Sequence, residues 1–196
     1  MRAVIVTEKG DPEHMTIGQV PTPEPAADEV LVRVHATALN RADTFQRRGH
    51  YPPPEGASDI LGLEMAGTVA ETGSDVVDWH EGDRVFGLLD GGGYAEYTVV
   101  HKDRLMAIPP GLSMEEAAAL PEVFLTAYQA LHWLADLQSE ETVLIHAGAS
   151  GVGTAATQLA RLQDATVIAT ASAPKHAVCQ DAGAQHVIDY TSTDFA

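Results

Sequence analysis

The feature that most constrains the fold is a series of short apolar segments in the last third of the chain. Thr142–His146 reads TVLIH and Thr166–Thr170 reads TVIAT. Short continuous apolar runs of this kind are typical of strands in a parallel sheet that is covered on both faces. A helical pattern over Gly153–Leu162 separates the two runs, and a second helix (Lys175–Ala182) and a third strand (His186–Asp189) follow. This β-α-β-α-β order predicts the first half of a doubly wound, Rossmann-type sheet.

The turn between the first of these strands and its helix has the composition of a phosphate-binding loop. It reads HAGASGVG from His146 to Gly153. Glycines there let backbone amides and the positive end of a helix dipole approach a pyrophosphate, although an ordinary tight turn is the alternative. In the strict G-x-G-x-x-G spacing counted from Gly148, the middle glycine falls on Ser150, and we expect the adjacent Gly151 to replace it. The predicted dinucleotide contacts are Ala149, Ser150, Gly151, Val152 and Gly153.

The end of the second strand predicts which nicotinamide cofactor is preferred. Dinucleotide folds that select NAD carry an acid about 20 residues after the first glycine, where it binds the ribose 2′-hydroxyl. Thr170–Lys175 reads TASAPK and has no acid. The missing acid removes repulsion against a 2′-phosphate, and Ser172 and Lys175 can contact that phosphate. We therefore predict NADPH as the cofactor. The alternative for Lys175 is a solvent-exposed residue at the start of a helix, with no role in cofactor binding.

The N-terminal part of the chain has a different pattern, with short strands between Gly, Pro and Asp turn signals. A short helix is expected near Asn40–Arg48 and another over Met114–Leu120, which Ser113 caps together with Glu116. The pattern predicts a compact, barrel-like β-domain over 1–120, and 121–196 forms the second domain, beginning with an amphipathic helix over Glu122–Leu134. Because the chain ends soon after the third parallel strand, we expect it to be C-terminally truncated. The expected strands of the first domain are Ala3–Thr7, Glu29–Ala36, Gly67–Glu71, Arg84–Leu89 and Tyr94–Val100.

Charge and composition exclude several classes of partner. The 196 residues carry 28 acidic and 11 basic side chains, a net charge of −17, which repels nucleic acids and anionic membranes. No segment has the length and hydrophobicity of a membrane span or a signal peptide, and a single cysteine, Cys179, gives no disulfide framework. We expect a cytoplasmic protein. Its acidity fits either an ordinary acidic enzyme or adaptation to a high-salt cytoplasm.

Three segments resemble a known family. They are ALNRADTFQRRGHYPPP (38–54), LPEVFLTAYQALH (120–132) and VLIHAGASGVGTAATQLAR (143–161). They are similar to the zinc-independent quinone oxidoreductases of the medium-chain dehydrogenase/reductase superfamily, and most of all to the tumour-suppressor-inducible animal branch. The resemblance implies a GroES-like β-barrel domain followed by a Rossmann-type NADPH domain, with the active site in the cleft between them.

The resemblance also carries expectations about individual residues. Zinc-dependent relatives have a cysteine ligand where Asn40 stands and a histidine where Leu63 stands, so no metal is expected and Glu64 is interpreted as structural. The family places Asn40 and Thr126 beside the nicotinamide and ribose. Tyr190 corresponds to a residue that helps hold the adenosine phosphate. Tyr51 lines the acceptor cleft, where it either hydrogen-bonds the reduced oxygen or is only an aromatic residue at the rim. For Asn40, the alternative to a cofactor contact is a structural role as a turn or helix-cap residue.

These residues predict a metal-free hydride transfer from NADPH to a quinone or a similar electron-poor acceptor. An enoyl or alkenal reductase of the same superfamily is the first alternative, and a non-catalytic cofactor-binding fragment is the second. We expect the full-length form to be a homodimer and the 196-residue chain alone to reduce acceptors poorly.

Overall fold

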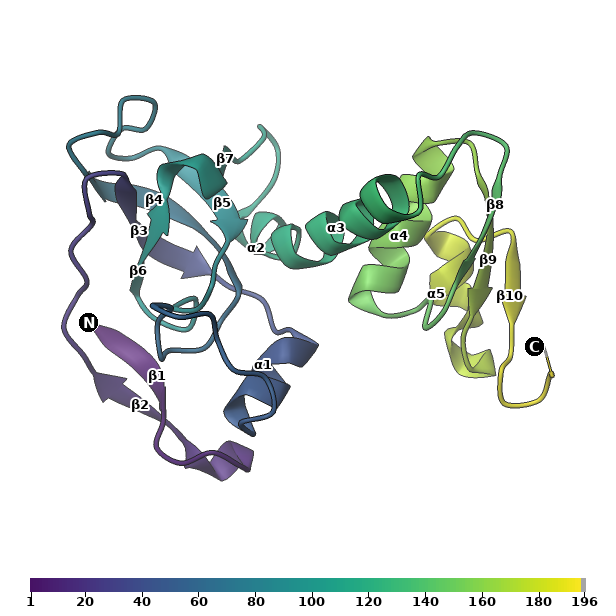
Figure 1. Cartoon of the computed structure of the whole chain (residues 1–196), viewed down its shortest axis with the longest axis horizontal. Helices are drawn as coiled ribbons and strands as arrows, with labels where there is room; N and C mark the ends of the chain where they lie inside the picture. Colours follow the sequence, from purple (N-terminus) through teal and green to yellow (C-terminus); the bar gives the residue numbers. More distant parts are fainter. Residues whose placement is uncertain (195–196) are drawn as a thin grey trace. The chain divides into compact units, whose positions relative to one another are not determined.

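The computed structural model describes residues 1–194, which divide into two compact units (Figure 1). The first unit is Met1–Glu122, and the second begins at Val123. The sequence pattern predicts the boundary between the two domains slightly earlier, after residue 120. Each unit has buried apolar clusters of its own, so each has the core that a compact unit needs.

The first unit is built on a five-stranded antiparallel sheet with the strand order β6-β3-β4-β5-β7. A separate antiparallel pair, β1 and β2, joins it through the bridge between Ala3 and Ala95 and a 2.9 Å bond from the Val4 amide to the Tyr94 carbonyl. Two short helices accompany the strands. The elements are β1 (Arg2–Val6), β2 (Met15–Gln19), β3 (Glu29–Ala36), α1 (Arg41–Arg47), β4 (Glu64–Thr72), β5 (Arg84–Leu88), β6 (Tyr97–His101), β7 (Leu105–Ala107) and α2 (Met114–Ala118).

The first residues of β3 show how this sheet acquires its core. Val30 and Val32 are fully buried, and they pack with Met65 of β4 and Val85 of β5. Leu31 between them is also buried, so this end of the strand is covered on both faces. The other face carries a second cluster, in which Ala66 and Phe86 pack against the alanines of α2. The Ser113–Glu116 capping box of α2 forms as predicted, with both reciprocal hydrogen bonds present.

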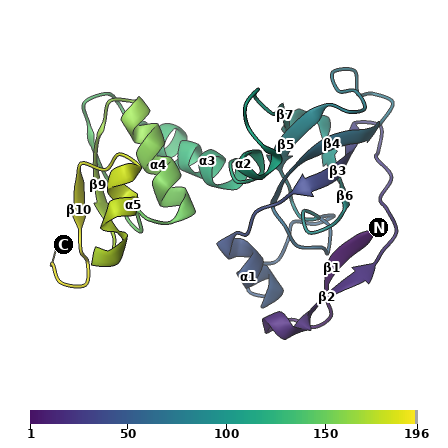
Figure 2. The same ribbon diagram turned by 180° about the vertical axis from the view of Figure 1, so that it is seen from behind.

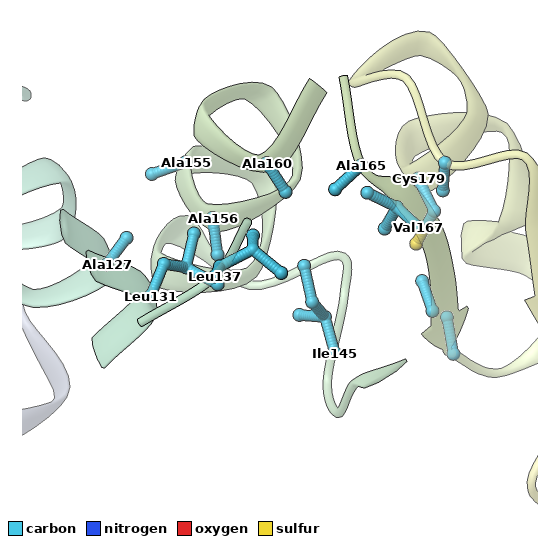
Figure 3. Close-up of a cluster of buried hydrophobic side chains, with 13 residues drawn as sticks. Ala127, Leu131, Leu137, Ile145, Ala155, Ala156, Ala160, Ala165, Val167 and Cys179 are labelled. Carbon is cyan, nitrogen blue, oxygen red and sulfur yellow. The ribbon is translucent and has the colours of Figure 1, made fainter. Parts of the chain in front are cut away.

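The second unit is a three-stranded parallel sheet in the order β10-β9-β8, with α4 and α5 side by side on one face (Figures 1 and 2). The buried face has Ile145, Val167 and Ala169, and the alanines of α4 pack over it together with Leu131 and Cys179 (Figure 3). Leu144 points to the opposite face and remains 47% exposed. The helix α3 (Pro121–Tyr128) begins in the last two residues of the first unit and continues into the second. The elements that follow are a π-helical continuation (Gln129–Leu134), β8 (Thr142–Ile145), α4 (Gly151–Leu162), β9 (Thr166–Thr170), α5 (His176–Asp181) and β10 (His186–Ile188).

The structure corrects several element boundaries. The helix α4 begins two residues before the predicted Gly153, and a 3₁₀ turn over Ala173–Lys175 precedes α5, which starts at His176 rather than at Lys175. The strands β2 and β7 were not predicted at all. No helix among the described residues has the length and hydrophobicity that crossing a membrane requires.

Candidate active site

Three loops meet at one edge of the parallel sheet in the second unit. The strands run in register, with Ile145 beside Ala169 and Ile188 beside Thr170, so the segments that follow them leave from the same end. Backbone bonds tie these loops together: the Gly148 amide donates to the Thr170 carbonyl at 2.9 Å, and the Ala171 amide donates to the Ile188 carbonyl at 3.0 Å. In open α/β sheets, ligands bind outside this end of the strands.

The loop after β8 presents the start of α4 to this edge. Ser150 caps the helix, since its Oγ accepts from the Gly153 amide at 3.0 Å and its carbonyl accepts from the Thr154 amide at 2.9 Å. This cap is why the helix starts at Gly151. The first amides of a helix have no intrahelical acceptor, and those of Gly151 and Val152 therefore remain for an anion.

The glycines of this loop have different structural reasons. A Cβ on Gly153 would lie 2.5 Å from the Ala147 carbonyl oxygen and 2.7 Å from that of Gly148, and one on Gly148 would lie 2.7 Å from the Ala169 Cβ. These two glycines let the turn pack closely on the helix and on β9. A Cβ on Gly151 would meet only the Val123 side chain, at 3.0 Å. A side chain at Gly151 would therefore press on Val123 and not on the backbone of the turn.

The loops after β9 and β10 carry the other predicted cofactor residues. Lys175 is exposed and its amide donates to the Ser172 carbonyl at 2.8 Å, so Ser172 and Lys175 share one turn beyond β9. Tyr190 follows β10 and is 55% exposed. Sequence reasoning missed His176, whose ring nitrogen donates to the Ala171 carbonyl at 3.1 Å and fixes this turn.

Within residues 1–194, Asp189 is the one acid that directly follows a strand at this edge of the sheet. The Thr191 hydroxyl and amide both donate to its carboxylate, at 2.6 and 3.0 Å. These hydrogen bonds lower the pKa of Asp189 below its ordinary value. It follows β10 rather than β9, so the end of β9 stays free of acids, as the sequence indicated.

In the first unit, Glu64 is the centre of a buried polar network. Its side chain is 1% exposed, and both carboxylate oxygens accept hydrogen bonds. Asn40 Nδ2 donates to Oε1 at 2.7 Å, and the Glu122 amide donates to Oε2 at 2.9 Å. Burial raises the pKa of Glu64, while these two donors act in the opposite direction because they favour the charged form.

Asp43 extends this network. Its Oδ2 accepts from the Asn40 amide and from the Tyr94 hydroxyl, both at 2.7 Å. Burial raises the pKa of Tyr94 strongly, and the hydrogen bond to Asp43 adds to the effect. Sequence reasoning missed Asp43, Tyr94 and Glu122 as members of the network. The N-x-x-D spacing from Asn40 is a capping signal that points to Asp43, but Tyr94 and Glu122 come from distant segments.

The predicted acceptor residue Tyr51 lies apart from these hydrogen bonds. It is 49% exposed and lines a cavity of about 150 Å³ together with Leu63, Leu89 and Glu122. Burial raises the pKa of Glu122, and the nearby charges of Glu64 and Asp43 raise it further. Thr126 is exposed on α3, in the second unit.

The donors for a metal ion are not gathered in this structure. Among residues 1–194, no group of three or more His, Cys, Asp or Glu side chains is placed to hold one. Leu63 is buried at 9% exposure, and Asn40 is committed to Glu64.

Known proteins of one superfamily are similar to this chain over most of its length. Residues 26–110 match the alcohol dehydrogenase GroES-like domain, and the quinone oxidoreductase of Coxiella burnetii superposes with a TM-score of 0.92 at 38% identity over 100% of this chain and 64% of its own. These matches relate the chain to the medium-chain dehydrogenase/reductase superfamily. Its architecture is the GroES-like antiparallel domain of that superfamily followed by a short parallel sheet, as predicted.

Other superfamily members are similar at nearly the same level. The Escherichia coli quinone oxidoreductase complexed with NADPH matches at 34% identity with a TM-score of 0.90, over 99% of this chain and 60% of its own. The CurK enoyl reductase matches at 34% identity with a TM-score of 0.90, over 96% of this chain and 59% of its own. The synaptic vesicle membrane protein VAT-1 homolog of Danio rerio is 39% identical over 99% of this chain. The chain spans 40% of the length of that relative and about 60% of the solved structures.

Proposed function

We propose that this chain belongs to an NADPH-dependent reductase of quinones and similar electron-poor acceptors that works without a metal ion. The observation that carries the proposal is the edge of the parallel sheet. Three segments follow the three strands at the same end of the sheet. They are a capped glycine turn after β8, an acid-free turn with an exposed lysine after β9, and the loop with Tyr190 after β10. Similarity to quinone oxidoreductases, one of them complexed with NADPH, supports the choice of reaction and cofactor.

The residues of the second unit fit the phosphates of this cofactor. The amides of Gly151 and Val152, at the positive end of α4, suit a pyrophosphate, and Gly153 keeps the turn tight enough to present them. Lys175 supplies a positive charge for a 2′-phosphate, and Ser172 in the same turn supplies a hydroxyl donor. When bound, NADPH supplies a hydride from C4 of its nicotinamide.

The remaining roles come from the family resemblance. By that resemblance, Asn40 contributes a side-chain amide to the nicotinamide riboside, and Thr126 is a second candidate for that group. The Tyr51 phenol donates a hydrogen bond to the acceptor oxygen, which gains negative charge as the acceptor is reduced. A quinone suits a site with a hydrogen-bond donor and no metal ion, because the hydride converts it to an aromatic hydroquinone anion. One proton then completes the reduction. No cation is required beside it.

A steady-state comparison of acceptors tests this proposal in the full protein that contains this chain. With NADPH as reductant, kcat/KM for 1,4-benzoquinone should exceed that for a simple α,β-unsaturated ketone by at least about tenfold, which corresponds to about 1.4 kcal/mol. Tyr51→Phe should lower kcat more than it raises KM. A preference for the enone, or no oxidation of NADPH with either acceptor, contradicts the proposal.

The second candidate is an enoyl or alkenal reductase. The similarity to the CurK enoyl reductase supports it. Both reactions use the same cofactor residues, and they differ in where the hydride arrives and where the proton is needed. The acceptor comparison therefore separates the two.

A further inference from the structure

Arg47, the last residue of α1, is a buried positive charge for which the described chain provides no partner. Its side chain is 7% exposed, and its Nε is shielded from solvent without a hydrogen-bond acceptor. Within residues 1–194, no acid forms an ion pair with it. Burying a guanidinium costs free energy that hydrogen bonds and a counter-ion normally offset. Both are missing for Arg47 among the side chains around it.

The groups that usually satisfy an arginine at the end of a helix are already engaged. Such an arginine binds the last carbonyl oxygens of its helix. Here those oxygens accept backbone hydrogen bonds of 2.8 to 3.3 Å, from the amides of Arg48, His50, Gly49 and Gly10 to the carbonyls of Thr44, Phe45, Gln46 and Arg47. Asp43 lies one turn earlier in α1, but its Oδ1 and Arg47 Nε both lack a partner, so the two side chains do not pair.

Arg47 lines a cavity of about 600 Å³ that lies wholly within the first unit. Three other charged residues, Glu8, Lys9 and Asp59, also border it. All three are exposed, so water and salt screen their charges. Arg47 is therefore the one buried charge in the wall of this cavity.

The cavity adjoins the smaller one that contains Tyr51. The two cavities share Gln46, Tyr51 and Pro53 as wall residues, and the smaller one has a volume of about 150 Å³. Gln46 Oε1 is also buried without a hydrogen-bond partner. Rotation of this side-chain amide by half a turn would direct its NH₂ group to the place of the oxygen. A ligand beside Arg47 would thus have a second donor next to it and Tyr51 within the same wall.

The charge and shape of this wall favour a carboxylate. The planar fork of a guanidinium matches the two oxygens of a carboxylate, and one buried positive charge balances one negative charge. A phosphate dianion would carry a second negative charge into a cavity bordered by Glu8 and Asp59.

We propose that Arg47 is a specificity-determining residue that binds a carboxylate group of the acceptor. The substrate class is then an electron-poor ring or double bond that carries a carboxylate, with the reducible part beside Tyr51. This inference rests on the proposed function for the identity of the ligand as an acceptor. The carboxylate site itself rests on the first unit alone.

Arg47→Met tests whether the charge serves the fold or a ligand. Methionine keeps most of the apolar stem and removes the charge, so the variant should melt at the same temperature as the wild type or higher. Arg48→Met is the matched control, because Arg48 is the exposed neighbour and lies outside the cavity wall. It should leave the melting temperature unchanged. A melting temperature several degrees lower for Arg47→Met than for Arg48→Met, or failure of Arg47→Met to fold, shows that the protein itself holds the guanidinium and overturns the proposal.

Calorimetry with two matched probes tests the site directly. The probes are 2,5-dihydroxybenzoate, which is the reduced form of a benzoquinone carboxylate, and the uncharged 2,5-dihydroxybenzamide. At low salt the wild-type chain should bind the carboxylate at least about tenfold more tightly than the amide. Arg47→Met should bind both within about threefold of each other, and Arg48→Met should keep the wild-type preference. Equal affinities in the wild type, a preference that survives Arg47→Met, or tighter binding of inorganic phosphate than of the carboxylate overturns the proposal.

Steady-state kinetics of the full protein separates this inference from the proposed function. With NADPH as reductant, kcat/KM for a benzoquinone carboxylate should exceed that for the corresponding amide by about the factor measured in calorimetry. If no quinone is reduced, the proposed function fails, and the calorimetry still decides the carboxylate site. If 1,4-benzoquinone is reduced but the carboxylate gives no advantage over the amide, the proposed function stands and the role of Arg47 is wrong.

Discussion

Gly153→Ala isolates the close approach between the glycine turn and α4. Gly153 is the third residue of the helix, where alanine would ordinarily stabilise by about 0.5–1 kcal/mol because it restricts the unfolded chain. The alanine Cβ would, however, lie 2.5 Å from the Ala147 carbonyl oxygen and 2.7 Å from that of Gly148. Both obstacles are backbone atoms of the same turn, so no side chain can rotate away.

The magnitude follows from the balance of these two effects. Overpacking against atoms that cannot yield costs about 1–3 kcal/mol, which exceeds the gain in helix propensity. We therefore expect a net loss of about 1–2 kcal/mol. For a unit of roughly 60–100 residues, such a loss lowers the melting temperature by about 4–16 °C. The distorted turn should also bind NADPH more weakly.

Gly151→Ala is the matched control, because Gly151 is the first residue of the same helix. Its Cβ would meet only a methyl group of Val123, at 3.0 Å, and no backbone atom, so a shift of a few tenths of an ångström relieves the contact. Urea and thermal melts followed by circular dichroism should place Gly151→Ala within about 0.5 kcal/mol of wild type and Gly153→Ala well below it. Equal stability of the two variants would refute the steric reasoning.

Three further predictions concern the buried network and the surface charge. Burial and the charges of Glu64 and Asp43 raise the pKa of Glu122 above 4.5, so its contribution to stability is present below that pH and is lost as pH rises through the raised pKa. The free energy of unfolding of Glu122→Gln, measured in urea melts, should therefore increase relative to that of the wild type between about pH 4 and pH 7. A difference that does not depend on pH contradicts this. Tyr94→Phe removes the 2.7 Å hydrogen bond to buried Asp43 and should cost about 1–3 kcal/mol in the same assay, whereas an unchanged midpoint would show that the bond contributes nothing. The net charge of −17 predicts that molar KCl raises the melting temperature by screening mutual repulsion, and a melting temperature that does not rise with salt would count against a high-salt adaptation.

The elements that the sequence predicted well are those with a strong local signal. The alternating residues of β3 and the apolar run of β9 give both strands their predicted bounds, Glu29–Ala36 and Thr166–Thr170. The strand β2 reads MTIGQ, where Gly18 and polar neighbours obscure the alternation. The strand β7 has only three residues, which is too short to show a period. Both are strands because of the partners they meet, which sequence periodicity does not reveal.

The candidate site divides in the same way. The glycine turn, Ser172 and Lys175 could be found from the sequence because each lies a fixed number of residues after a recognisable strand. The Glu64 network could not, since Asn40 and Glu122 lie 24 and 58 positions away from Glu64 in the sequence. Its Asp43–Tyr94 bond spans 51 residues, and only folding brings those side chains together.

Cofactor discrimination tests the central claim most directly. Calorimetric titrations should show that the chain binds NADPH more tightly than NADH by at least about tenfold, because we assign Lys175 and Ser172 to the 2′-phosphate and no acid follows β9. Lys175→Gln should remove most of this preference, while the control Lys9→Gln, an exposed lysine of the first unit, should leave it unchanged. Equal affinity of the wild type for the two cofactors, or a preference that survives Lys175→Gln, would contradict the assignment of this turn to NADPH.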